Sequence, residues 1–186
     1  MITRFLPAAE RVASPWKKGG GITREIAAWP EGAGLDAFDW RISMAEVNEA
    51  GGFSLFPEVD RTLTVLSGAL SLSFAGGKVG FLDPTSDPYA FPGDVACHGA
   101  PLGGPVLDLN VMCRRGRFAA TVERIADEAW TPSGETALLV ALEPLAVGAE
   151  TLGAHDALIF TEMDPADEAF LHVGGRALGI RLTAIS

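Results

Sequence analysis

Apolar and polar side chains alternate in short runs along most of the chain, and glycine and proline separate the runs. Alternation with a period of two is typical of β-strands that bury one face. The runs predict strands over 40–47, 61–66, 69–74, 106–113, 136–142, 156–162 and 177–185. Helical periodicity is almost absent, and only 165–169 predicts a helical turn. The pattern therefore predicts an all-β protein.

The spacing of these strands, about ten residues, favours a barrel or a sandwich, and a barrel closes its own edges. Ser67-Gly68 joins two of the runs and predicts a compact hairpin, because glycine adopts positive φ without strain. Composition changes near 115–122, which predicts a first barrel over 1–117 and a second, shorter one over 118–186. Strands near that boundary could belong to both.

Charge narrows the choice of partners. The formal net charge is −10, divided as −2 up to Arg117 and −8 beyond it, and nucleic-acid binding needs clustered lysine and arginine. No apolar run approaches the ~20 residues of a membrane helix, and no signal sequence is recognisable. We therefore expect a soluble, cytoplasmic protein with no nucleic-acid or membrane partner, compatible with a homodimer. Cys97 and Cys113 are expected to be reduced core thiols.

Three stretches carry candidate chemistry. The first, PWKKGGGITRE at 15–25, combines three glycines, which permit close backbone approach, with Lys17 and its neighbour Lys18. Both lysines precede the glycines, so this is not a phosphate-binding P-loop. The alternative is a tight loop with solvent-facing lysines before a strand.

The second stretch ends in Arg61, which alternation places on the same face as Leu63 and Val65. If that face points into a barrel, the guanidinium is a half-buried cation whose planar fork suits a carboxylate. The alternative is an ion pair of Arg61 with Asp60 or Glu58 at the start of the strand.

The third stretch places Asp108, Asn110, Met112 and Arg114 on one face of a strand. Asn110 offers a donor and an acceptor, which inside a pocket would orient an amide or carboxyl ligand. The alternative is an outer, solvated face.

The sequence gives little support for a metal site or for a catalytic nucleophile. His98, His155 and His172 lie far apart and lack the spacing that brings two imidazoles to one metal. Cys97 and His98 are adjacent, so on a strand they point to opposite faces. We expect no metal and no cofactor.

Four ordered motifs resemble those of the HutD family, also called Ves. They are PWKKGGGITREI at 15–26, DWRIS at 39–43, FSLFPEVDRTL at 53–63 and DLNVMCRR at 108–115. Together they span about 15 to 117. Lys18 stands where the family usually has Asn, which removes an amide that would contact a ligand. Glu58 stands where it usually has Gly, and a residue with a Cβ resists positive φ.

The resemblance implies a bicupin, that is, two double-stranded β-helix (jelly-roll) barrels in one chain. It also implies a role in bacterial histidine utilisation. Members are thought to bind a small acidic intermediate, such as formylglutamate, formiminoglutamate or urocanate, and to restrain the pathway as a sensor or regulator. Some members are described only as stress-related.

The metal-cupin pattern, placed on this sequence, implies an inverted site. The glutamate ligand of metal cupins falls seven residues before Gly68, at Arg61, and the H-x-H region, 53–57, holds no histidine. Ala96 stands three residues after Gly93, where a further histidine is expected. A site built in this way should prefer an anion to a cation.

The expected ligand-binding residues divide by role. Arg61 would bind a carboxylate through two hydrogen bonds. Asn110 and Ser54 would hydrogen-bond an amide or a second carboxyl group of the ligand. The walls of the pocket would be formed by Phe53, Phe56 and Met112. The secondary candidates are Lys17, Thr23, Glu25 and Arg41. The alternative is a metal-independent cupin enzyme, a hydrolase or isomerase with Glu25, Asp60 or Asp108 as general base; a third is an interaction protein with an empty barrel.

Overall fold

The computed structural model describes residues 1–17, 19–164 and 170–185, so Lys18 and the helical turn expected over 165–169 lie outside the described residues. The described chain is built from β-strands and one short 3-10 helix, η1 (Ala8–Glu10). It forms two compact units, Val12–Arg115, and Met1–Arg11 together with Gly116–Ser186. Within the described ranges, no helix is long and apolar enough to span a membrane.

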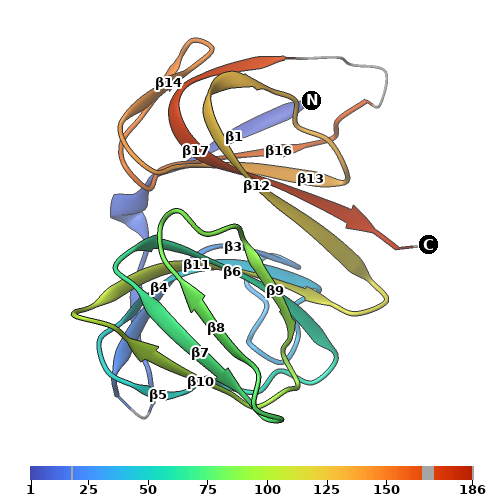
Figure 1. The fold of residues 1–186 in the computed structure, drawn as a ribbon. Helices are drawn as coiled ribbons and strands as arrows, with labels where there is room; N and C mark the ends of the chain where they lie inside the picture. Colours follow the sequence, from blue (N-terminus) through green and yellow to red (C-terminus); the bar gives the residue numbers. More distant parts are fainter. Residues whose placement is uncertain (18, 165–169, 186) are drawn as a thin grey trace. The chain divides into compact units, whose positions relative to one another are not determined.

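The unit formed by Val12–Arg115 contains two antiparallel sheets (Figure 1). The larger sheet has the strand order β2 (Ala13–Pro15), β3 (Gly21–Trp29), β4 (Trp40–Val47), β11 (Val106–Arg114), β6 (Val59–Ser67) and β9 (Tyr89–Pro92). The smaller sheet has the order β5 (Gly51–Gly52), β10 (Cys97–Pro101), β7 (Leu70–Phe74) and β8 (Val79–Leu82). The alternating runs at 40–47, 61–66, 69–74 and 106–113 correspond to β4, β6, β7 and β11, so these strand predictions are confirmed.

An apolar core lies between the two sheets of this unit. Leu63 and Val65 of β6 cluster with Leu70 and Leu72 of β7, and all four are at most 1% exposed. Because side chains alternate along a strand, Arg61 shares the inward face of β6 with Leu63 and Val65. That expectation from the sequence is confirmed by the burial of Arg61.

The hairpin predicted at Ser67-Gly68 is not formed. In the described structure β6 pairs with β11 and β9, and β7 pairs with β10 and β8. Gly68, at φ 78°, carries the chain from one sheet to the other, and a Cβ there would lie 2.5 Å from the carbonyl oxygen of Pro105. Gly68 therefore lies in a connection between the two sheets. The local sequence cannot distinguish such a connection from a hairpin turn.

The other unit is a seven-stranded antiparallel sheet. Its order is β1 (Ile2–Leu6), β16 (Ala157–Thr161), β13 (Thr136–Ala141), β17 (Leu171–Ala184), β14 (Leu145–Val147) and β15 (Glu150–Leu152), and β12 (Phe118–Trp130) also pairs with β17. Because β1 pairs with β16, the first eleven residues belong to this second unit. The predicted first barrel, 1–117, had included them. The chain thus has the all-β, two-barrel architecture expected of a bicupin.

Glycines in the second unit mark an irregularity inside a strand. The alternating run predicted a strand only from 177, but β17 begins at Leu171 and runs through Gly174 and Gly175. The register against β12 shifts between Ala126 and Glu128, opposite this glycine pair. A β-bulge of this kind bends a strand without ending it.

Glu58→Gly is expected to raise the free energy of unfolding by about 1 kcal/mol. Glu58 precedes β6 at φ 58°, a left-handed conformation that a residue with a Cβ adopts at a cost and that glycine adopts freely. Urea unfolding of Glu58→Gly and of Glu58→Ala measures the effect, since alanine keeps the Cβ but removes the carboxylate. A glycine variant no more stable than the alanine variant would contradict this explanation.

Candidate functional site

A row of polar side chains crosses the inward face of the larger sheet. β11 lies between β4 and β6, with Asn110 opposite Ser43 on one side and Leu63 on the other. Arg61 of β6 lies opposite Met112 of β11, and Met112 is the next residue after Asn110 on the same face of β11. Diagonal neighbours on one face are within reach of long side chains, so Arg61 and Asn110 can meet.

Hydrogen bonds join three of these groups in a chain. Arg61 donates from Nε and Nη2 to Oδ1 of Asn110, at 3.2 and 2.8 Å. Nδ2 of Asn110 donates in turn to Oδ1 of Asp108 at 2.9 Å. The amide is therefore fixed between a cation and a carboxyl group, and Arg61 reaches Asp108 only through Asn110.

The guanidinium of Arg61 lies among aromatic rings. Its Cζ is 5.1 Å from the ring centre of Phe91, 5.4 Å from that of Phe53 and 5.7 Å from that of Phe56. Such contacts attract a cation to the ring face. Arg61 is 7% exposed, and no carboxylate of a described residue lies within the 4.0 Å of an ion pair. The barrel thus holds a buried cation without a directly paired anion.

Burial governs the ionisation of this cluster. It lowers the pKa of Arg61 to about 10, while Asp108 and Cys97 act to raise it and Arg41 to lower it further. The guanidinium therefore stays charged at neutral pH. Burial also raises the pKa of Asp108 to about 7, against the opposing effects of the Asn110 hydrogen bond and the Arg61 charge.

A second arginine stands in the same row with its own partners. Arg41 of β4 donates from Nε to Oε2 of Glu25 at 2.7 Å and from Nη1 to Oγ of Ser43 at 3.3 Å. Glu25 lies on β3 at a register shift relative to β4. Arg41 and Glu25, both secondary candidates, thus form an ion pair beside the Arg61 cluster.

Four other predicted residues are not part of this hydrogen-bonded chain. Lys17 and Ser54 are exposed, and the structure records no bond from either to Arg61. Thr23 is half-buried and accepts a hydrogen bond from Nε1 of Trp16 at 2.7 Å. Met112 is buried in a separate apolar cluster that Phe56 also contacts. Their roles as ligand-binding residues stay predictions.

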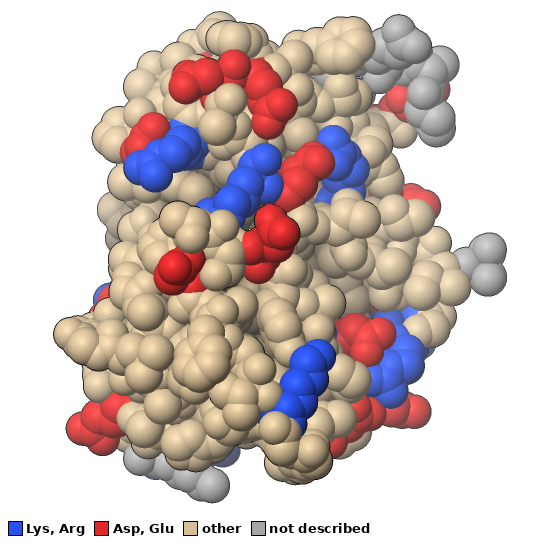
Figure 2. Space-filling view, in the orientation of Figure 1, with Lys and Arg blue, Asp and Glu red and all other residues tan. Residues whose placement is uncertain are grey.

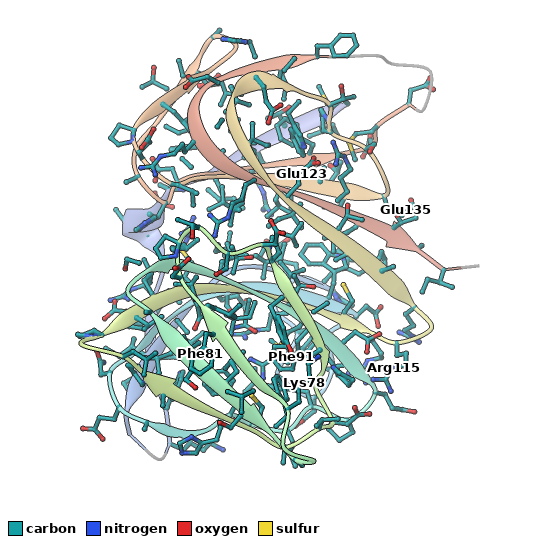
Figure 3. The ribbon with its side chains drawn as sticks, in the orientation of Figure 1. Lys78, Phe81, Phe91, Arg115, Glu123 and Glu135 are labelled. Carbon is teal, nitrogen blue, oxygen red and sulfur yellow. The ribbon has the colours of Figure 1, made fainter. Side chains whose placement is uncertain are left out.

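The alternative ion pair of Arg61 with Asp60 is not formed. Neighbours on a strand point to opposite faces, so Asp60 faces away from the guanidinium of Arg61. It pairs instead with Arg115 at 2.8 Å, and Arg115 also pairs with Asp94 at 3.1 Å. Figure 3 labels Arg115, which is an exposed arginine of the same unit.

Two contributors to the site were not predicted from the sequence. Phe91 of β9, labelled in Figure 3, reaches Arg61 because β9 pairs with β6 and places these two residues opposite each other. Gly93 follows β9, and a Cβ there would lie 3.3 Å from Cδ of Arg61 and 2.8 Å from the Val59 carbonyl oxygen. The sequence Pro92-Gly93-Asp94 could have indicated this contact, because a glycine is needed where the backbone approaches a neighbouring side chain so closely.

The residues at this position do not fit a metal ion. Divalent metals in cupin-type sites need imidazole and carboxylate ligands, whereas a guanidinium and three phenyl rings occupy the place here. Among the residues that the structure describes, no three His, Cys, Asp or Glu side chains gather as metal ligands. Cys97 and Cys113 are buried and unlinked.

The fold and the cluster define a cupin-like protein with two barrels, the first of which encloses a buried guanidinium. The HutD family model matches residues 8–177, and the chain belongs to the HutD family. The resemblance found in the four sequence motifs is confirmed.

Relatives and solved structures agree with this assignment. The chain is similar to "Protein Ves" of Cronobacter sakazakii, at 35% identity over 68% of each protein. It is 36% identical to an "Uncharacterized 21.2 kDa protein in hutC 3'region" of Pseudomonas putida, over 64% of this chain and 63% of that protein. HutD from Pseudomonas fluorescens SBW25 superposes with a TM-score of 0.88 at 32% identity, covering 100% of both chains.

More distant structures share the fold alone. The bacterial pirin YhhW of Escherichia coli, solved in complex with nickel(II), has a TM-score of 0.60 at 9% identity and covers 100% of both chains. Its nickel ion therefore says nothing about the site at Arg61.

Proposed function

We propose that the Val12–Arg115 barrel binds a small carboxylic acid at Arg61, and that the protein acts as a cytoplasmic sensor or regulator in bacterial histidine utilisation. Membership of the HutD family supports the pathway, as does similarity to a Pseudomonas putida protein of the hutC 3' region. The candidate ligands are N-formylglutamate, formiminoglutamate and urocanate.

The buried, charged and unpaired state of Arg61 is the observation that carries this proposal. A buried cation is costly unless an anion compensates it, and the nearest carboxyl group, Asp108, contacts Arg61 only through Asn110. Asn110 occupies Nε and Nη2, whereas Nη1 donates no hydrogen bond to a described residue. A ligand carboxylate would use this free side of the fork.

The surroundings favour a ligand with an apolar or planar body next to its carboxylate. Phe53 and Phe56 are half-buried and flank the guanidinium, so they can contact both Arg61 and a bound molecule. Binding sites commonly combine apolar walls with a few polar groups that fix orientation. Urocanate and acylated glutamates have this composition.

Among the described residues of the second unit, every arginine is half-buried or exposed, whereas Arg61 is buried. The apolar core of this unit includes Leu139, Phe160 and Val173. The arginine beside that core, Arg181, is already paired with Glu123 (labelled in Figure 3) and donates to the Thr131 carbonyl at 3.1 Å. Charged side chains of both signs are interspersed on the visible face in Figure 2. We therefore assign the ligand to the first barrel.

Ligand-induced stabilisation tests this function. At a ligand concentration about 100 times the Kd, the native state should gain about 2.7 kcal/mol, which a thermal unfolding scan detects as a higher Tm. The panel is N-formyl-L-glutamate, N-formimino-L-glutamate and urocanate, and the methyl ester of urocanate is the control without a carboxylate. A Tm that no acid raises, or that the ester raises equally, would contradict the proposal.

Asp108 also favours a second candidate, a metal-independent enzyme. A carboxyl group with a pKa of about 7 is suited to proton transfer at neutral pH. The other two proposed bases are occupied, because Glu25 pairs with Arg41 and Asp60 with Arg115. NMR of N-formyl-L-glutamate incubated with the protein separates the two functions: formate release indicates a hydrolase, and an unchanged compound indicates a binder.

A further inference from the structure

Asp108 has an oxygen atom without a partner in the middle of the buried cluster. The residue is 1% exposed, and while Oδ1 accepts from Asn110, Oδ2 is buried and has no hydrogen-bond partner. Its cross-strand neighbours are the apolar residues Ala45 of β4 and Val65 of β6. A buried polar atom without a hydrogen bond is uncommon in folded proteins and calls for an explanation.

The titratable groups of the Asp108–Arg61 cluster come from four other strands. β6 contributes Arg61, β4 contributes Arg41 with its β3 partner Glu25, and β10 contributes the thiol of Cys97; of these, Arg41 and Cys97 act on Arg61. Burial raises the pKa of this thiol, so it stays neutral near pH 7. Arg61 is the cation that acts on Asp108, and it does so across the amide of Asn110.

An acid bound at Arg61 would bring a second carboxylate into this cluster. The two anions would share one guanidinium in a poorly solvated interior, where like charges strongly disfavour joint ionisation. The ligand would contact the fork directly, whereas Asp108 is separated from it by Asn110. The ligand therefore keeps its charge, and Asp108 is the group that becomes neutral.

We propose that acid binding at Arg61 is coupled to protonation of Asp108, so that the site takes up a carboxylate and a proton together. This inference rests on the proposed function and adds its regulation by pH. The proton turns Oδ2 into a hydrogen-bond donor, and a second oxygen of the ligand, such as a formyl or amide carbonyl, would accept from it and so give the atom a partner.

The direction of the pH dependence follows from the free protein. Burial raises the pKa of Asp108 to about 7, and a bound anion raises it further. Below pH 7 the proton is already in place, so affinity is nearly constant. Above pH 7 binding must recruit the proton, and the Kd should rise by about tenfold per pH unit. Arg61, with a pKa of about 10, stays charged throughout this range.

Isothermal titration calorimetry with N-formyl-L-glutamate tests the coupling. Titrations at pH 6, 7, 8 and 9, each in two buffers with different ionisation enthalpies, give both the Kd and the number of protons taken up. At pH 8 the wild type should take up close to one proton per ligand. Asp108→Asn keeps the shape and the Asn110 contact but has no titrating group, so it should bind with a constant Kd and no proton uptake.

Infrared difference spectroscopy gives a second readout that does not depend on calorimetry. Adding N-formyl-L-glutamate at pH 8 should produce the carbonyl band of a protonated carboxyl group, and that band should be absent from Asp108→Asn. Binding without proton uptake and without this band contradicts the coupling but leaves the proposed function intact. If the compound does not bind at any pH, while the other acids of the panel also fail, both are contradicted.

Discussion

Arg61→Met is expected to weaken the binding of N-formyl-L-glutamate by at least about 30-fold and to abolish the ligand-induced rise in Tm. Removing one partner of a buried, hydrogen-bonded charge pair costs about 2–5 kcal/mol of binding free energy. Methionine fills a similar volume among the three phenyl rings and removes a desolvated cation, so the variant should fold. Calorimetric titration at pH 6 measures the change.

Two further variants separate the charge from its geometry. Arg61→Lys keeps the cation but loses the planar fork, and we expect an intermediate loss of about tenfold. Arg115→Met is the matched control, because Arg115 belongs to the same unit but pairs with Asp60 and Asp94 at the surface. Its affinity should equal that of the wild type. Equal affinities for Arg61→Met and Arg115→Met would contradict the proposal that Arg61 binds the ligand.

Asp108→Asn is expected to raise the free energy of unfolding at pH 8 by several kcal/mol. The carboxyl pKa is about 7 in the folded protein, against 3.8 for the ordinary group. Between these values the folded state holds a proton that the unfolded state has released, so wild-type stability falls as pH rises through this window. The fall is on the order of 4 kcal/mol, is complete above pH 7, and does not occur with asparagine.

Urea unfolding of both proteins at pH 5 and pH 8 measures this effect. pH 5 lies near the acid end of this window, so only about a third of the fall has occurred and the two proteins should differ less there than at pH 8. At pH 8 the variant should be clearly the more stable, because the pKa of about 7 already includes the attraction between Asp108 and Arg61. Asp87→Asn, at an exposed position, is the matched control for the substitution itself. A stability difference for Asp108→Asn that shrinks from pH 5 to pH 8 would contradict the assignment.

Alternation predicted much of the first barrel because its strands are short and have distinct faces. The run from 61 placed Arg61 with Leu63 and Val65, and the structure buries all three. Alternation cannot tell which face is inside, however. The row of Asp108 and Asn110 was equally compatible with an outer face, and it lies inside because both faces of β11 are buried.

Contacts made by strand pairing could not be predicted from local sequence. Phe91 meets Arg61 only because β9 pairs with β6, and the first eleven residues join the second unit because β1 pairs with β16. The long strand β12 was missed because its acidic residues interrupt the alternation. The asparagine that links Arg61 to Asp108 was found as a ligand group, but its role as a bridge depends on register.

A crystal structure of the protein grown with N-formyl-L-glutamate at pH 6 tests the central claim most directly. The account predicts electron density for the compound in the first barrel, with a carboxylate oxygen about 3 Å from Nη1 of Arg61. Density for the acid at another place, or a metal ion coordinated where Arg61 now lies, would contradict it.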